Sequence, residues 1–189
     1  MKEVADVIGE ICKIILPINE DIFFGNQKSS VAICTLSSIM LLKEISKSNL
    51  MKKIVLAGRL LSENKGIDSL VRYVITDDKI KTIILCGKDV RGHKAGHSLL
   101  ALYENGIDKS GRIIGSHSPD PNLTVTKDEI KKFCNQVKII NRMGETNLEK
   151  ITLLVNKLVT IFLPVSINLI FSLVFFKISS GVKLSSSDA

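Results

Sequence analysis

The chain has 189 residues, 45% of them hydrophobic, and a formal net charge of +7. This length suffices for one compact domain with an appendage and excludes two ordinary domains. Scattered lysines, no Trp and only two Tyr argue against nucleic-acid binding, which favours a clustered basic patch with aromatic rings for base stacking.

The predicted elements alternate between strand and helix. An amphipathic helix with a short extended piece is expected over residues 1–24, before a polar loop. The strands that follow are predicted at 31–35, 53–57, 82–86, 112–114 and 137–140, and the helices at 39–47, 67–75, 95–103 and 126–137. Thr126 with Glu129 forms a capping-box pattern. The alternation predicts an α/β fold, with a Rossmann-like, doubly wound, mostly parallel sheet.

The C-terminal region differs in kind. Residues 158–176 contain no charged residue, and a helix of that length spans roughly 30 Å, about one hydrocarbon core. A buried core helix is the alternative, but core helices usually keep a polar face. We expect a transmembrane helix there, after a linker at 151–157 and before a polar tail at 177–189.

The expected cellular compartment follows from the N-terminal sequence, the cysteines and the C-terminal hydrophobic run. Glu3, Asp6 and Glu10 precede any apolar run, so no secretory signal is recognisable. The four cysteines have no CxxC spacing, and three lie in apolar runs typical of buried, reduced thiols. We therefore expect a single-pass protein of the cell membrane with a cytoplasmic body.

The stretch 83–115 is the most informative part of the chain. An apolar strand meets Gly87 and a polar loop, and the carboxyl ends of such strands bind ligands in open α/β sheets. The glycines there lack the Gly-Lys-Ser/Thr of a phosphate loop. His93 and His97 stand four residues apart, as a metal pair would, but no third ligand accompanies them. We interpret His97 as a packing or capping residue and His117 as a loop residue.

Longer motifs carry a family resemblance. They are Leu85-Cys86-Gly87, Val90-x-Gly92-His93-x-x-Gly96, Ala101-Leu102-x-x-Asn105-Gly106-x-Asp108, Arg112-x-Ile114-Gly115 and, upstream, Glu63-Asn64-x-Gly66-Ile67. Together these motifs resemble the A subunit of tetrahydromethanopterin S-methyltransferase. The resemblance covers residues 28–150, which we expect to be the binding domain, with residues 1–27 as a helical N-terminal segment.

The resemblance implies a cobamide-carrying, corrinoid-dependent methyltransferase subunit of methanogenesis. It implies that the metal of the site is the corrinoid cobalt and that His93 is its lower axial ligand. His93 is then also the catalytic residue. A methyl group would pass from methyl-tetrahydromethanopterin to cobalt and then to coenzyme M, in a membrane complex whose other subunits couple the transfer to sodium movement. Asp89 is the expected partner of the second imidazole nitrogen.

The corrinoid is expected over the carboxyl ends of the strands, where glycines let the backbone approach a large flat ring. The residues predicted to line that site, besides His93 and Asp89, are Thr35, Leu36, Ser37, Glu63, Asn64, Gly66, Gly87, Gly92, Gly96, Gly115, Ser116 and Pro121.

Two segments depart from the family pattern. Residues 116–121 are more polar than the family's apolar run, and residues 50–61 also differ from the transferase subunit. The form Ala57-Gly58-Arg59-Leu60-Leu61-Ser62-Glu63-Asn64 resembles a homologous group outside the intact complex. These departures bear more on coenzyme M and sodium coupling than on cobamide binding. The alternative function is a non-catalytic, membrane-tethered α/β binding or scaffold protein that has lost the cofactor. A nucleotide-binding enzyme is a more distant alternative, because no acidic metal ligands accompany the loop.

Overall fold

A five-stranded mixed sheet forms the centre of the computed structural model, which describes residues 22–161. The spatial strand order is β1-β3-β2-β4-β5. Strands β2, β3, β4 and β5 run parallel, and β1 pairs antiparallel with β3 at one edge. The strands are β1 (Phe23–Phe24), β2 (Val31–Cys34), β3 (Leu56–Gly58), β4 (Thr82–Gly87) and β5 (Lys138–Met143).

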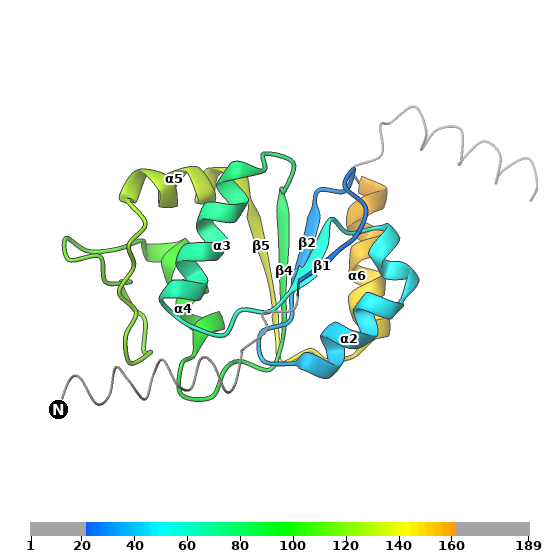
Figure 1. Ribbon diagram of the computed structural model, residues 1–189, viewed down its shortest axis with the longest axis horizontal. Helices are drawn as coiled ribbons and strands as arrows, with labels where there is room; N and C mark the ends of the chain where they lie inside the picture. Colours follow the sequence, from blue (N-terminus) through cyan, green and yellow to red (C-terminus); the bar gives the residue numbers. More distant parts are fainter. Residues whose placement is uncertain (1–21, 162–189) are drawn as a thin grey trace, which may run out of the picture.

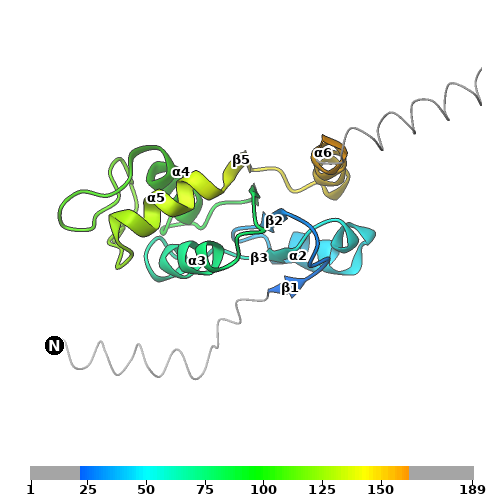
Figure 2. The same ribbon diagram turned by 90° about the horizontal axis from the view of Figure 1, so that it is seen from above.

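Helices cover both faces of this sheet (Figures 1 and 2). Helices α3, α4 and α5 lie on one face, and α2 and α6 lie on the other. The helices are α2 (Ile39–Lys47), η1 (Asn49–Lys52), α3 (Lys65–Thr76), α4 (Ala95–Asn105), α5 (Lys127–Gln136) and α6 (Leu148–Ile161). Strands β2 and β4 are buried along their whole length, because each is flanked by other strands and covered on both faces.

Two hydrophobic cores result from this layering. The larger one lies under α3, α4 and α5 and contains Phe133, whose ring meets that of Tyr103 edge-on. The smaller one lies under α2 and α6, where Ile151 and Val155 of α6 are buried against the sheet.

Several local predictions are confirmed. Helix α2 has the predicted bounds. Thr126 caps α5 in a capping box, because its hydroxyl accepts the Glu129 N–H while the Glu129 carboxylate accepts the Thr126 N–H. Strand β3 begins at Leu56, later than predicted, and η1, capped by Ser48, precedes it.

The strand predicted at 112–114 is wrong. This segment makes only isolated bridges, Ile107 with Ile113 and Arg112 with Asn122, and does not join the sheet. Its apolar signal has another cause, because Ile113 is buried in the core under α3, α4 and α5. The edge position beside β4 belongs to β5 instead.

The predicted fold class is wrong, because it joined the Rossmann-like sheet to a C-terminal membrane helix. Within residues 22–161 no helix is long and apolar enough to cross a bilayer. Helix α6 begins at Leu148, carries Glu149, Lys150 and Lys157, and packs on the sheet through its apolar face. It also runs through the expected linker at 151–157. The rest of the predicted span, 162–176, and the predicted tail lie outside the described residues, as does the N-terminal segment up to residue 21.

The carboxyl ends of β2 and β4 form a topological switch point of the sheet. The chain leaves β2 toward α2 on one face of the sheet and leaves β4 toward α4 on the other. Such a reversal of direction between neighbouring strands opens a ligand-binding crevice in α/β sheets. The loop 88–94 between β4 and α4 emerges there.

Candidate functional site

A histidine–carboxylate pair lies on the loops at this end of the sheet. His93, on the loop that follows β4, places its Nδ1 2.8 Å from Oε2 of Glu63, on the loop that precedes α3. The His93 side chain is 59% exposed, whereas that of Glu63 is 1% exposed. A carboxylate only accepts hydrogen bonds, so Nδ1 carries the proton of the contact, and in the neutral imidazole Nε2 keeps its lone pair.

Glu63 is held on its other side as well. Its Oε1 accepts the Asp120 N–H at 3.1 Å, and the Asp120 carboxylate accepts the Asn64 side-chain N–H at 3.1 Å. The loops before α3 and α5 are thereby joined behind His93. Asp120 was not predicted as a site residue, although the Pro119-Asp120-Pro121 turn was recognisable as rigid.

Asp89 does not contact the His93 ring, contrary to its predicted role. Its Oδ1 accepts the Gly96 N–H at 2.8 Å, and its Oδ2 accepts the His97 N–H at 3.1 Å. The carboxylate thus satisfies free N–H groups at the start of α4. Spacing along the chain could not reveal this, because Glu63, thirty positions away, takes the place next to His93.

Glycines give the loop its shape. Gly92, before His93, has φ +87°, and a Cβ added there would meet no atom within 4 Å. Lys94, after His93, is also left-handed, with φ +47°. Gly96 lies so close to the Met143 sulfur and to Leu36 that a Cβ would approach them at 2.6 and 2.9 Å. The His93 backbone is therefore open to a ligand while α4 behind it is tightly packed.

The residues after β2 hold the neighbouring loops through hydrogen bonds. Ser37 donates its hydroxyl hydrogen to Lys88 O at 2.7 Å. Leu36 is fully buried with φ +52°, and Arg59 donates to its carbonyl at 3.3 Å. The fully buried Thr35 donates its hydroxyl to Gly58 O at 3.3 Å. These contacts fix the loops at the carboxyl ends of β2, β3 and β4. Arg59 was not among the predicted site residues.

The remaining predicted residues are spread around this centre. Gly66 lies in the first turn of α3, and its N–H donates to the Ser62 hydroxyl at 2.8 Å. Gly115, with φ +80°, and the buried Pro121 shape the loop that carries Asp120. Ser116 joins Ser98 and Ser118 in a triangle of hydroxyls 2.7 to 2.8 Å apart.

The metal-pair alternative for His93 and His97 finds no support in the geometry. The His97 ring stacks on His117 with centroids 4.8 Å apart. Among residues 22–161, no three His, Cys, Asp or Glu side chains gather as a metal site would require. His97 is thus a packing residue, as interpreted, and His117 is its partner.

The thiols of β2 and β4 are not reactive groups. Burial raises the pKa of Cys34 to about 12, and burial also raises the pKa of Cys86 far above its ordinary range. Thiolate is the nucleophilic form of cysteine, so neither side chain can attack or ligate near neutral pH.

Comparison with known protein families places the chain in one of them. The family model that describes the A subunit of tetrahydromethanopterin S-methyltransferase matches residues 15–161, most of the chain. The chain belongs to this family. The predicted family resemblance is therefore confirmed, and so is the prediction that the chain is part of a methyltransferase.

Three relatives show the extent of the similarity. The chain is 37% identical over 141 residues to the A subunit of a putative methyltransferase, Mtx, of Methanosarcina barkeri, covering 74% of this chain and 68% of the relative. It is 35% identical to the first-numbered A subunit of the tetrahydromethanopterin S-methyltransferase of Methanothermobacter thermautotrophicus, covering 66% and 51%. For the corresponding A subunit of Methanosphaera stadtmanae the identity is 33%, covering 70% and 52%. The match spans between about half and two thirds of the length of these relatives.

Proposed function

We propose that this chain is the cobamide-carrying subunit of a methyltransferase, with His93 as the lower axial ligand of cobalt. The observation that carries the proposal is the 2.8 Å contact between His93 Nδ1 and the buried Glu63 carboxylate. Metal-binding histidines commonly donate their second N–H to a carboxylate, which fixes the tautomer and the ring orientation.

The residues present fit such a group. The described residues give His93 Nε2 no hydrogen-bond partner, and imidazole nitrogen is a suitable donor for a transition metal. The half-exposed ring and the open space at Gly92 leave room for a large flat ligand. When bound, a cobamide would supply the metal centre that accepts and releases a methyl group.

The chain's own contribution is to orient the His93 ring so that its Nε2 faces the ligand site. Glu63 keeps the proton of the neutral imidazole on Nδ1, so that Nε2 of this tautomer offers its lone pair. Asp120 and Asn64 immobilise Glu63, and Asp89 anchors the start of α4 behind the loop. His93 lies between two left-handed residues outside regular structure, so the loop and not the sheet presents the ring to a ligand.

For the complete reaction, we propose methyl-tetrahydromethanopterin as donor and coenzyme M as acceptor, with other subunits of a complex providing their sites and sodium coupling. The donor is supported by the names of several relatives. The acceptor and the sodium coupling rest on the family resemblance alone. The relatives from the Mtx methyltransferase carry neither substrate in their names.

Corrinoid retention tests the proposal. The full chain is incubated with hydroxocobalamin, desalted and examined by visible absorption, beside His93→Ala and the control His117→Ala. We expect the wild type and the control to retain the corrinoid with one spectrum, and His93→Ala to lose it or to show a changed spectrum. A wild type that retains no corrinoid would instead support the scaffold alternative.

A further inference from the structure

The fold gathers lysines that are scattered along the sequence. Lys81 directly precedes β4, Lys138 is the first residue of β5, and the Lys138 N–H donates to the Lys81 carbonyl at 2.9 Å. Parallel strands in register begin at one level, so the turns that lead into them share one edge of the sheet. Exposed lysines of these turns and of α5 form a basic face there, which consists of Lys28, Lys52, Lys53, Lys79, Lys81, Lys131, Lys132 and Lys138.

Hydrogen bonds hold the turns of the basic face together. The Ser30 carbonyl accepts the Lys81 N–H at 2.9 Å, and the Lys53 carbonyl accepts the Ser29 hydroxyl at 2.7 Å. Lys131 and Lys132 of α5 line one open depression together with Lys81. In Figure 1 these segments lie along the upper end of the sheet, whereas the loop 88–94 lies at the lower end. The basic face and the candidate site therefore occupy opposite ends of the sheet.

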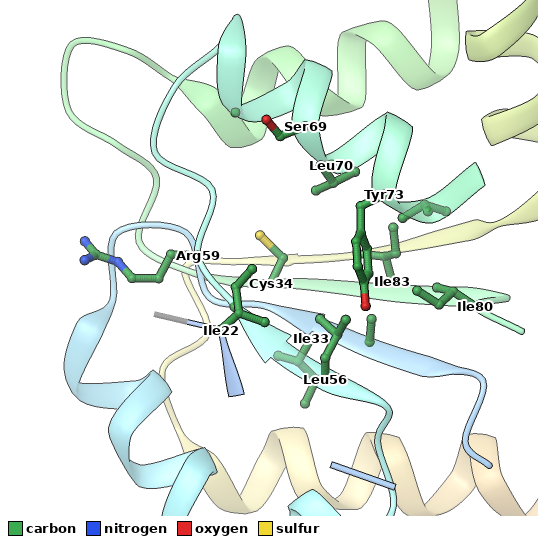
Figure 3. A pocket seen from close by; sticks show the side chains of 14 residues that line it. Ile22, Ile33, Cys34, Leu56, Arg59, Ser69, Leu70, Tyr73, Ile80 and Ile83 are labelled. Atoms are coloured by element: carbon green, nitrogen blue, oxygen red, sulfur yellow. The ribbon is translucent and has the colours of Figure 1, made fainter. Parts of the chain in front are cut away.

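The apolar side chains between these lysines point inward. Ile80, between Lys79 and Lys81, is fully buried, and Figure 3 shows it among the residues that line an apolar cavity under α3. Phe133 of α5, which follows two lysines of the basic face, is fully buried as well. At these positions the face therefore presents charged groups to solvent and no aromatic ring.

Fewer carboxylates lie near the basic face. Asp77 and Asp78 belong to the turn before β4, and Asp128 lines the depression on α5. Glu129 of α5 lies 3.6 Å from Arg72, which balances its charge. The lysines outnumber these carboxylates, so this end of the sheet carries a net positive charge.

A face of lysines without arginine or exposed aromatic residues among them narrows the kind of partner. Protein interfaces are depleted of lysine and depend on aromatic and arginine anchors. Proteins that bind single-stranded nucleic acid use aromatic rings on which bases stack. Anionic lipid head groups attract lysines as point charges near the membrane surface, and this attraction needs no fixed geometry.

We propose that the basic face docks on a membrane surface that contains anionic lipid. The proposal does not depend on corrinoid binding. Each lysine close to such a surface raises the affinity by about five-fold, and the attraction extends over about one screening length. In this orientation the loop 88–94 with His93 points away from the lipid, which leaves the candidate site open to other molecules.

Vesicle binding tests the proposal. The full chain is sedimented with vesicles of phosphatidylcholine and with vesicles of an equimolar mixture of phosphatidylcholine and phosphatidylglycerol. We expect tighter binding to the mixed vesicles. This difference should disappear when the ionic strength rises from about 0.1 M to about 1 M, because the screening length falls from about 10 Å to about 3 Å.

Paired lysine substitutions locate the contact. Lys131→Gln/Lys132→Gln removes two charges from the basic face, and the control Lys65→Gln/Lys150→Gln removes two exposed charges from the first turns of α3 and α6, at the opposite end of the sheet. We expect the first variant to lower the affinity for the mixed vesicles by about 10- to 30-fold and the control by about two-fold or less.

Other partners give other results. Equal binding to both kinds of vesicle, or an equal loss in the face variant and the control, would overturn the proposal. A tighter affinity for single-stranded RNA or for polyglutamate than for the mixed vesicles would overturn it by assigning the face to nucleic acid or to an acidic protein. An unchanged far-UV circular dichroism spectrum confirms that each variant is folded.

Discussion

Replacing Glu63 with glutamine tests the proposed role of the carboxylate with almost no change in shape. Glu63 accepts two hydrogen bonds, from His93 Nδ1–H at 2.8 Å and from Asp120 N–H at 3.1 Å. Glutamine offers one oxygen and one NH₂ group at the same places, so it can accept only one of them. If the glutamine oxygen keeps the hydrogen bond from Asp120 N–H, the NH₂ group faces His93 Nδ1. Nδ1 must then accept a hydrogen bond, so the imidazole proton moves to Nε2, and Nε2 can no longer ligate a metal.

The magnitude follows from the bond that is lost. A hydrogen bond to a charged group contributes about 1.5–3 kcal/mol, which corresponds to about 10- to 100-fold in an equilibrium constant. Loss of a metal ligand's carboxylate partner typically has the same effect on metal affinity, about 10- to 100-fold. We therefore expect Glu63→Gln to weaken hydroxocobalamin binding by about 10- to 100-fold.

The assay is a spectroscopic titration of the full chain with hydroxocobalamin. Glu104→Gln, which removes one exposed carboxylate near the end of α4, is the matched control and should bind as the wild type does. Circular dichroism establishes that each variant is folded. An affinity for Glu63→Gln within about two-fold of the wild type would refute the proposed role of the carboxylate.

Three further predictions concern stability and reactivity. Gly87→Ala should lower the free energy of unfolding by about 2–5 kcal/mol in urea titrations, because φ is +77° and the added Cβ would clash with Thr35 O. Gly106→Ala, with φ +69° and open space, should cost less, and an equal cost would contradict the steric account. Thr126→Ala should cost about 1 kcal/mol through loss of the α5 N-cap, and an unchanged urea midpoint would argue against the cap. Burial raises the pKa of Cys34 to about 12, so this thiol should resist alkylation by iodoacetamide at pH 8 in the native protein. Peptide mass spectrometry measures the alkylation, and a rate as fast as in urea would contradict this.

Much of the α/β body could be predicted because its signals are local. The fully apolar runs of β2 and β4, the periodicity of α2 and the Thr126–Glu129 capping box each depend on neighbouring residues. The strand prediction at 112–114 is wrong because burial of Ile113 in a loop gives the same apolar signal as burial in a strand.

The C-terminal prediction is wrong for a different reason. The long uncharged run from residue 158 predicts an independent helix, whereas α6 begins at Leu148 and already packs on the sheet. Hydropathy describes composition and does not show that residues 158–161 belong to a helix that begins at Leu148. The amphipathic first part, with Ile151 and Val155 buried, is what joins α6 to the fold.

The sequence could predict which loop carries the candidate site, but not which side chains contact one another there. The Gly92-His93-x-x-Gly96 motif located the loop. The partner of His93 could not be inferred from spacing, because Asp89 lies nearer in sequence and Glu63 lies nearer in space. Glu63 was predicted to line the site, but only the fold shows that its carboxylate meets the imidazole.

The most direct test of the proposed function is the visible spectrum of the full chain after incubation with hydroxocobalamin and desalting, recorded for the wild type and His93→Ala. We expect one retained corrinoid per wild-type chain and a spectrum that His93→Ala changes or abolishes. Retention by both proteins with identical spectra and affinities would contradict ligation by His93.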